Sequence, residues 1–181
     1  FDASTDFTIG IEEEYQLLDP STLGLTSRYD DLMAAADPVF RERLAGELIS
    51  SEVEYRTTKH DTFASAARNL VEGRLATIEL AERLGVAIGI SGVHPFSQWM
   101  DQRIIDTPHY RLVESGLGYV AWTNNTWSLH LHCGVRGADR AMDHRPTRSL
   151  PYSVDIELRQ HDGEARSAIA RRRDPLPDRG D

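Results

Sequence analysis

Several features that mark common protein classes are scarce in this sequence. Its 181 residues include one cysteine, Cys133, so no disulfide can form within the chain and a reducing compartment is expected. No apolar run approaches the roughly 18 residues that a membrane span needs, so no membrane partner is expected. The first residues lack the basic and apolar layout of a secretion signal, which favours a cytoplasmic location.

Basic residues are also in the minority. Lysine and arginine together number 20 against 29 acidic residues, which gives a net charge of −9. Proteins that bind nucleic acid usually present a basic face, so no nucleic-acid partner is expected. An acidic chain that handles anionic substrates needs metal cations to bridge the like charges, so a metal is anticipated.

The usual nucleotide and hydrolase motifs are missing as well. The sequence has no Gly-x-Ser-x-Gly elbow, no Walker-type phosphate loop and no Gly-x-Gly-x-x-Gly turn. Cys133 falls on the apolar side of a strand-like pattern, so we expect a small buried hydrophobic residue there and not a nucleophile.

Strand-like and helix-like segments alternate through the first 142 residues. The expected strands cover residues 7–18, 47–57, 86–91 and 126–135. The expected helices cover residues 28–36, 38–46, 61–84 and 107–115, with Asp37 and Asp61 as N-caps of the second and third. This order predicts an α+β or α/β domain with helices on one face of a sheet.

The character of the chain changes after about residue 142. Residues 143–181 contain four of the eight prolines, and only residues 152–158 resemble a strand. We therefore expect a domain over residues 1–142 and a divergent tail over residues 143–181, the end of which is disordered.

Three glutamates in a row lie in the first expected strand. Side chains alternate along a strand, so Glu12 and Glu14 share one face, roughly 6–7 Å apart, while Glu13 faces the other way. Their like charges repel unless a cation such as Mg²⁺ lies between them. The alternative is a solvated acidic face. Glu13 is expected to find an arginine or a backbone donor.

The second and fourth expected strands repeat this pattern. Glu52, Glu54 and Arg56 share a face, and the planar Arg56 guanidinium suits a substrate carboxylate. Taken alone, the pattern slightly favours the alternative, a local cross-strand salt bridge with nothing bound. His130 and His132 also share a face, which suits a metal or a phosphate, the alternative being a polar face open to water. Carboxylates with some imidazole favour Mg²⁺ or Mn²⁺ over zinc.

Four short motifs, taken in order, resemble the type 2 glutamate–cysteine ligase family, also called carboxylate–amine ligases. The resemblance covers about residues 7–142. The motifs are GIEEEY at residues 10–15, SEVEYRT at 51–57, GVHPF at 92–96 and HLHCGV at 130–135.

The resemblance implies a glutamine-synthetase-like α+β fold with a curved, mainly antiparallel sheet, incomplete in this chain, and helices on its outer face. It implies that ATP phosphorylates the γ-carboxylate of glutamate and that an amine such as cysteine then displaces phosphate. Divalent cations, Mg²⁺ or Mn²⁺, would lie at the floor of the sheet.

The resemblance also suggests residue roles. The metal ligands would be Glu12, Glu14, Glu47, Glu54 and His130. His130 and His132 would lie by the ATP phosphates, and Arg56 and His132 would be catalytic, Arg56 facing the glutamate carboxylate. Glu47 would need a bulge to reach the others. His94 either lines the substrate side or holds a proline turn.

Other interpretations stay open. Family members are longer, and a later strand with a Val-Glu-x-Arg element finds only a faint echo at residues 155–159. The chain could be a catalytically incomplete fragment that keeps metal or nucleotide binding or an interaction role. It could also be an unrelated metal-dependent hydrolase. An open sheet edge would favour association into homo-oligomers.

Overall fold

The computed structural model describes residues 4–123 and 125–137. They belong to two compact units, one containing the described residues 4–8 and 133–137 and the other those from 9 to 132. The second unit contains nearly all of the regular structure. The expected tail over residues 143–181, including the candidate strand at 152–158, lies outside the described residues.

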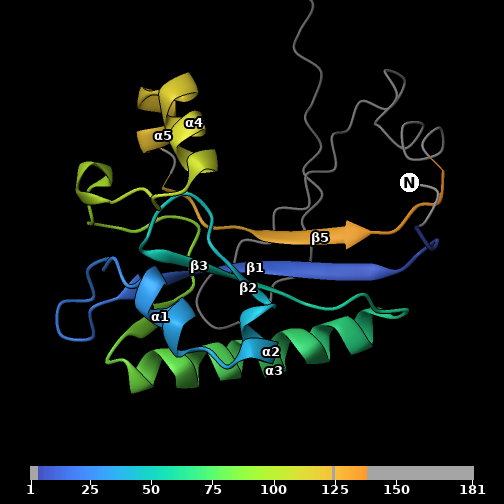
Figure 1. Ribbon diagram of the computed structural model, residues 1–181. Coiled ribbons are helices and arrows are strands. Elements are labelled where there is room, and N and C mark those ends of the chain that lie inside the picture. The colour runs from blue at the N-terminus through green and yellow to red at the C-terminus, as the bar shows by residue number, and fades with distance from the viewer. Residues whose placement is uncertain (1–3, 124, 138–181) are drawn as a thin grey trace, which may run out of the picture. The chain divides into compact units, whose positions relative to one another are not determined.

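A five-stranded sheet forms the centre of the fold (Figure 1). Its strands are β1 (Ile9–Leu18), β2 (Leu44–Ala45), β3 (Glu52–Arg56), β4 (Ala87–Gly89) and β5 (Leu129–Cys133). The order is β2-β3-β1-β4, with β5 also pairing with β1, and the pairs β1–β3, β1–β4 and β2–β3 are antiparallel. The expectation of an α+β fold with a mainly antiparallel sheet is confirmed.

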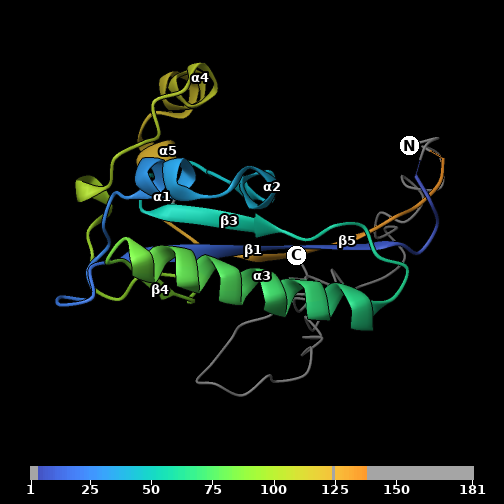
Figure 2. The same cartoon turned by 60° about the horizontal axis from the view of Figure 1, so that its bottom comes forward.

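Helices lie outside the sheet, and the longest, α3, runs along one of its faces (Figures 1 and 2). The helices are α1 (Tyr29–Ala35), α2 (Pro38–Arg41), α3 (Phe63–Arg83), α4 (Pro108–Leu117) and α5 (Tyr119–Thr123), with a short 3₁₀ helix at Trp99–Asp101. Among the described residues, no helix has both the length and the apolar character to cross a membrane.

The main hydrophobic core fills the space between α3 and the sheet. Apolar side chains from alternate positions of β1 meet the inner face of α3 there, as the period-two pattern predicts. Its fully buried members include Tyr15, Leu17, Val53, Ala66, Leu80 and Ala81. A smaller cluster around Leu48, Ile49, Ala121 and Trp127 joins the β2–β3 connection to α5.

The helix boundaries follow local capping chemistry. Asp37 accepts hydrogen bonds from the backbone N–H groups of Val39 and Phe40, with Pro38 in the first turn, as predicted. The N-cap of α3 is Thr62, which accepts from Ser65 N–H at 3.2 Å, so the assignment of this cap to Asp61 was wrong. Gly85, at φ +67°, follows the end of α3 as expected.

Two further expectations need correction. The helix that begins at Pro38 ends at Arg41, and Leu44–Ala45 instead pairs with β3, so residues 47–51 are a connection and not part of a strand. Cys133 was expected to be buried but is exposed. The apolar side of β5 is only partly covered, because Leu129 packs on the main core whereas Leu131 is 45% exposed.

Candidate metal-binding site

The predicted polar faces of β1 and β3 lie side by side. Three residue pairs stand directly opposite one another in the antiparallel register: Glu12 with Arg56, Glu14 with Glu54, and Gln16 with Glu52. Their side chains point away from α3, because the intervening residue Glu13 contacts Arg74 of that helix. The prediction that Glu12 and Glu14 share a face is confirmed.

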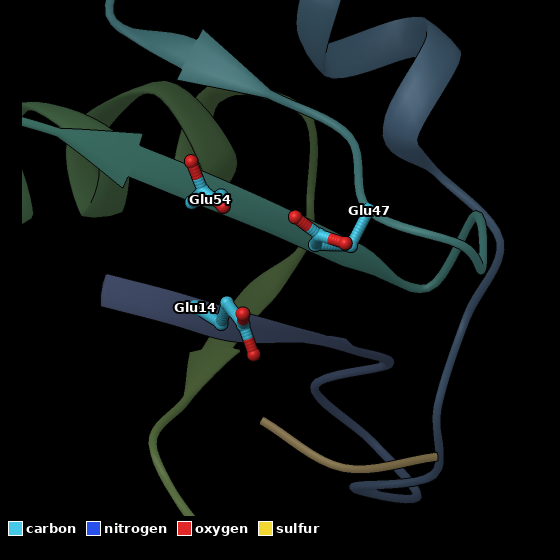
Figure 3. Close-up of side chains that lie close together, drawn as sticks. All are labelled: Glu14, Glu47 and Glu54. Carbon is cyan, nitrogen blue, oxygen red and sulfur yellow. The ribbon is translucent and has the colours of Figure 1, made fainter. Parts of the chain in front are cut away.

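Three carboxylates converge on this face. Glu14 of β1, Glu54 of β3 and Glu47 each place one oxygen atom within 4.8 Å of the other two (Figure 3). Glu47 comes from the connection between β2 and β3, so it reaches the other two without the strand bulge that had been expected to be necessary.

Burial distinguishes this group from a solvated acidic face. Glu14 and Glu54 are only 6% and 4% exposed, and for Glu14 this contradicts the alternative of a solvated acidic face. Burial raises the pKa of Glu14, although the Ser128 N–H, which donates to Glu14 Oε2 at 2.6 Å, lowers it. Burial, followed by the negative charge of Glu12, raises the pKa of Glu54 to about 8.

Glu52 is a fourth carboxylate of the site, which the sequence placed on this face but which was not among the expected metal ligands. It is 3% exposed, and its Oε1 atom has no hydrogen-bond partner among the described residues. Burial, followed by the charge of Glu14, raises its pKa to about 10. The alternation that places Glu54 on this face also places Glu52 there, so the signal was present in the sequence.

A cavity of about 260 Å³ opens beside the carboxylates. It is lined by Glu14, Glu47, Leu48, Glu52, Thr126, Ser128 and His130. The donor set is dominated by carboxylate oxygens, the ligands that Mg²⁺ and Mn²⁺ prefer. A cation there would neutralise buried like charges and give Glu52 Oε1 a partner, so the residues fit a divalent metal.

The two histidines of β5 lie next to this group. His132 Nε2 is 2.8 Å from Glu12 Oε2, and His130 Nδ1 is 3.5 Å from the same oxygen and 3.9 Å from Glu14 Oε1. Both imidazole side chains are about half exposed. Glu12 therefore lies with the histidines and outside the three-carboxylate cluster, and its role as a metal ligand stays a prediction.

Arg56 and His94 have different surroundings. Arg56 Nε lies 3.6 Å from Glu54 Oε1, which fits a local ion pair as well as a substrate-facing guanidinium. The ring of His94 accepts from Ser97 N–H at Nδ1 and meets the Leu23 carbonyl at Nε2, both at 2.9 Å. Both nitrogens of His94 thus hold the turn, in agreement with the structural alternative.

Glu13 has the partner that was expected for it. Arg74 of α3 binds its carboxylate with two hydrogen bonds, of 3.0 Å from Nε and 2.6 Å from Nη2. The Tyr15 hydroxyl donates to Glu13 Oε2 at 2.6 Å. This buried network lies on the helix side of the sheet, opposite the carboxylate cluster.

The fold has a counterpart among solved structures. Glutamate–cysteine ligase from Francisella tularensis, crystallised in complex with AMP, matches with a TM-score of 0.54 at 17% identity. The match covers 72% of this chain and 28% of that protein. At this identity the likeness concerns the fold.

Sequence relatives are closer. A protein of Rubrobacter xylanophilus named as a candidate glutamate–cysteine ligase 2-2 is 43% identical over 135 residues, 75% of this chain and 34% of its own length. One from Bordetella avium, named as a candidate glutamate–cysteine ligase 2, is 34% identical over 144 residues, 78% of this chain and 36% of its own length. The chain thus spans about a third of these relatives. The model of glutamate–cysteine ligase family 2 (GCS2) matches residues 8–152. The chain therefore belongs to glutamate–cysteine ligase family 2.

Proposed function

We propose that this chain carries the metal- and phosphate-binding part of an ATP-dependent ligase. The reaction would join the γ-carboxylate of glutamate to an amine such as cysteine. The observation that carries the proposal is the convergence of Glu14, Glu47 and Glu54, two of them buried, in a member of this ligase family. The AMP bound to the Francisella tularensis enzyme supports a nucleotide as one ligand.

The carboxylates would hold Mg²⁺ or Mn²⁺. Glu14, Glu47 and Glu54 would be ligands, with Glu52 beside them and Glu12 on the histidine side. The cation would supply charge neutralisation for the phosphates of ATP, which the acidic face alone would repel. This need would account for the gathering of four carboxylates on one face of the sheet.

The other polar residues would orient the substrates. His130 and His132 border the cluster and are half exposed, so their ring N–H groups would reach phosphate oxygens. Glu12 would orient His132, because its Oε2 atom lies 2.8 Å from His132 Nε2. The exposed Arg56 guanidinium, already beside Glu54, would bind a carboxylate of glutamate. Positioning of this kind accounts for much of the rate of phosphoryl transfer.

The proposed reaction has two steps, phosphorylation of glutamate and attack by the amine. A γ-carboxylate oxygen of glutamate attacks the terminal phosphorus of ATP, and ADP leaves. The amine nitrogen then attacks the acyl carbon, the C–O bond to phosphate breaks, and the nitrogen loses a proton. The products are the amide, ADP and phosphate.

Phosphate release from ATP by the 181-residue chain tests the proposal. The expected result is release that requires Mg²⁺, glutamate and an amine together. Phosphate release at the same rate without glutamate and amine would contradict the proposed ligase activity and support a hydrolase.

A second candidate function is favoured by the length of the chain, which spans about a third of its relatives. A fragment could keep the cation site without completing the reaction. Its signature would be a Mg²⁺-dependent rise in melting temperature without phosphate release. Absence of both release and thermal shift would contradict the metal site itself.

A further inference from the structure

Helix α3 packs along the far side of the carboxylate strands, and two of its consecutive residues, Gly73 and Arg74, meet β3 and β1 there. Glu13 of β1 and Tyr55 of β3 stand directly opposite each other in the register. Arg74 binds Glu13 through both guanidinium hydrogen bonds. The preceding residue, Gly73, lies so close to the Tyr55 ring that a Cβ added there would be 1.9 Å from Cζ.

The two contacted residues are chain neighbours of the site. Glu13 lies between Glu12 and Glu14, and Tyr55 directly follows Glu54. Because side chains alternate along a strand, the neighbours project to the opposite face, into the candidate site. A shift of Glu13 or Tyr55 relative to α3 therefore moves the carboxylates that must converge on one cation.

The Glu13–Arg74 ion pair fixes a more precise geometry than packing of α3 on the sheet alone requires. Glu13 is almost fully buried, and a buried ion pair is often no more stabilising than an apolar pair of similar volume. Its two parallel hydrogen bonds fix the guanidinium and carboxylate planes in one geometry. The Tyr15 hydroxyl adds a third bond, so Glu13 has one well-defined position.

We propose that Arg74, supported by Gly73, is a positioning residue for the metal site, setting the relation of β1 to β3 through Glu13 and Tyr55. The inference rests on the proposed function, since it assumes that the carboxylate cluster binds a divalent cation. Arg74 itself touches none of the cluster residues' carboxylates; it acts through the strand that presents them.

Mn²⁺ binding to the 181-residue chain, measured by calorimetry and by the electron paramagnetic resonance of free Mn²⁺, is the test. Arg74→Met is expected to weaken the affinity by about tenfold, the lower end of the range for losing a direct partner of a metal ligand, because Arg74 acts through Glu13. Arg74→Lys keeps the positive charge but cannot form two parallel hydrogen bonds to Glu13, so its Mn²⁺ affinity should lie between those of Arg74→Met and the wild type. Arg68→Met, at an exposed position of the same helix, should leave the affinity unchanged.

Two further variants separate positioning from stability. Leu80→Ala removes buried core contacts of α3, so it should lower stability while the folded protein keeps its Mn²⁺ affinity. The double change Glu13→Met with Arg74→Met leaves no unpaired buried charge, so this variant should fold. Its Mn²⁺ affinity should nevertheless be lower than that of the wild type, as in Arg74→Met.

The outcomes are distinct. Folded Arg74→Met, or the folded double variant, with wild-type Mn²⁺ affinity would overturn the positioning role alone. A wild-type chain that binds no Mn²⁺ would overturn the cation site of the proposed function, and the positioning role with it.

Discussion

Glu14 of β1 and Glu54 of β3 lie directly opposite each other in the antiparallel register, and both are almost completely buried. Like charges directly opposite on neighbouring strands destabilise a sheet, and burial increases the cost. Glu47 adds a third carboxylate and Glu52 a fourth. Such an arrangement is costly for the fold alone, and the proposed divalent cation would offset that cost.

Glu54→Gln is therefore expected to have opposite effects on stability and on binding. Removing one of the crowded carboxylates should raise the free energy of unfolding of the metal-free chain by roughly 1 kcal/mol. The same change should abolish most of the increase in melting temperature that Mg²⁺ produces. Thermal unfolding with and without Mg²⁺ measures both, and Glu82→Gln, at an exposed position of α3, is the control.

The stability of the metal-free chain should depend on pH in an unusual direction. The pKa of Glu54 is raised from 4.5 to about 8 and that of Glu52 from 4.5 to about 10, so the folded state binds more protons than the unfolded state. The contribution of these two groups to the free energy of unfolding is therefore greatest below about pH 4.5, the pKa of an unfolded glutamate. It is lost as the pH rises towards and through their folded-state pKa values. Urea unfolding should show a clear fall in the free energy of unfolding between about pH 5 and pH 8.

Saturating Mg²⁺ should remove this loss, because the cation binds the ionised carboxylates. Its affinity should rise by roughly tenfold per pH unit for each proton displaced. A metal-free chain that becomes steadily more stable from pH 5 to pH 8 would contradict the assignment of protons to Glu52 and Glu54.

Glu12→Gln should weaken Mg²⁺-linked ATP binding. Glu12 holds the His132 ring at 2.8 Å, so its loss should affect the phosphate side of the site even if the three-carboxylate cluster still binds metal. Titration of ATP in the presence of Mg²⁺, followed by calorimetry, measures the effect, expected to be about tenfold. An unchanged ATP affinity would mean that Glu12 only pairs with the half-exposed histidines and has no part in nucleotide binding.

Gly73→Ala tests the close approach of α3 to β3. The added methyl group would collide with the Tyr55 ring, so α3 or the ring must move, at a cost of roughly 1–3 kcal/mol. Gly116→Ala in α4 is the matched control, since nothing lies within 4 Å of its added Cβ, and it should gain roughly 0.5–1 kcal/mol from helix propensity. Equal effects at both glycines would mean that the tight packing at Gly73 is absent in solution.

The face assignments could be predicted from the sequence because they depend only on the two-residue period of a strand. That period correctly separated Glu12 and Glu14 from Glu13, and it placed Glu52 on the same face as Glu54, although Glu52 was not among the expected ligands. Glu47 was assigned to a strand because residues 47–57 are rich in strand-forming side chains. Its true place depends on the pairing of Leu44–Ala45 with β3, a contact that the period does not encode.

Other parts of the site depend on contacts between residues far apart in the chain. Ser128 donates its N–H to Glu14 across 114 positions, and Arg74 meets Glu13 across 61. A requirement for some partner of Glu13 followed from burying a charge, but one sequence could not say which arginine supplies it.

The cation site is tested by comparing Mn²⁺ binding to the wild-type chain with binding to the double variant Glu14→Gln with Glu54→Gln. The loss of the free Mn²⁺ electron paramagnetic resonance signal on addition of protein gives the number of bound ions and their affinity. We expect bound Mn²⁺ in the wild type, displaced by Mg²⁺, and at least about 100-fold weaker binding in the double variant. Equal binding by a folded double variant, or no binding by the wild type, would contradict the proposed cation site.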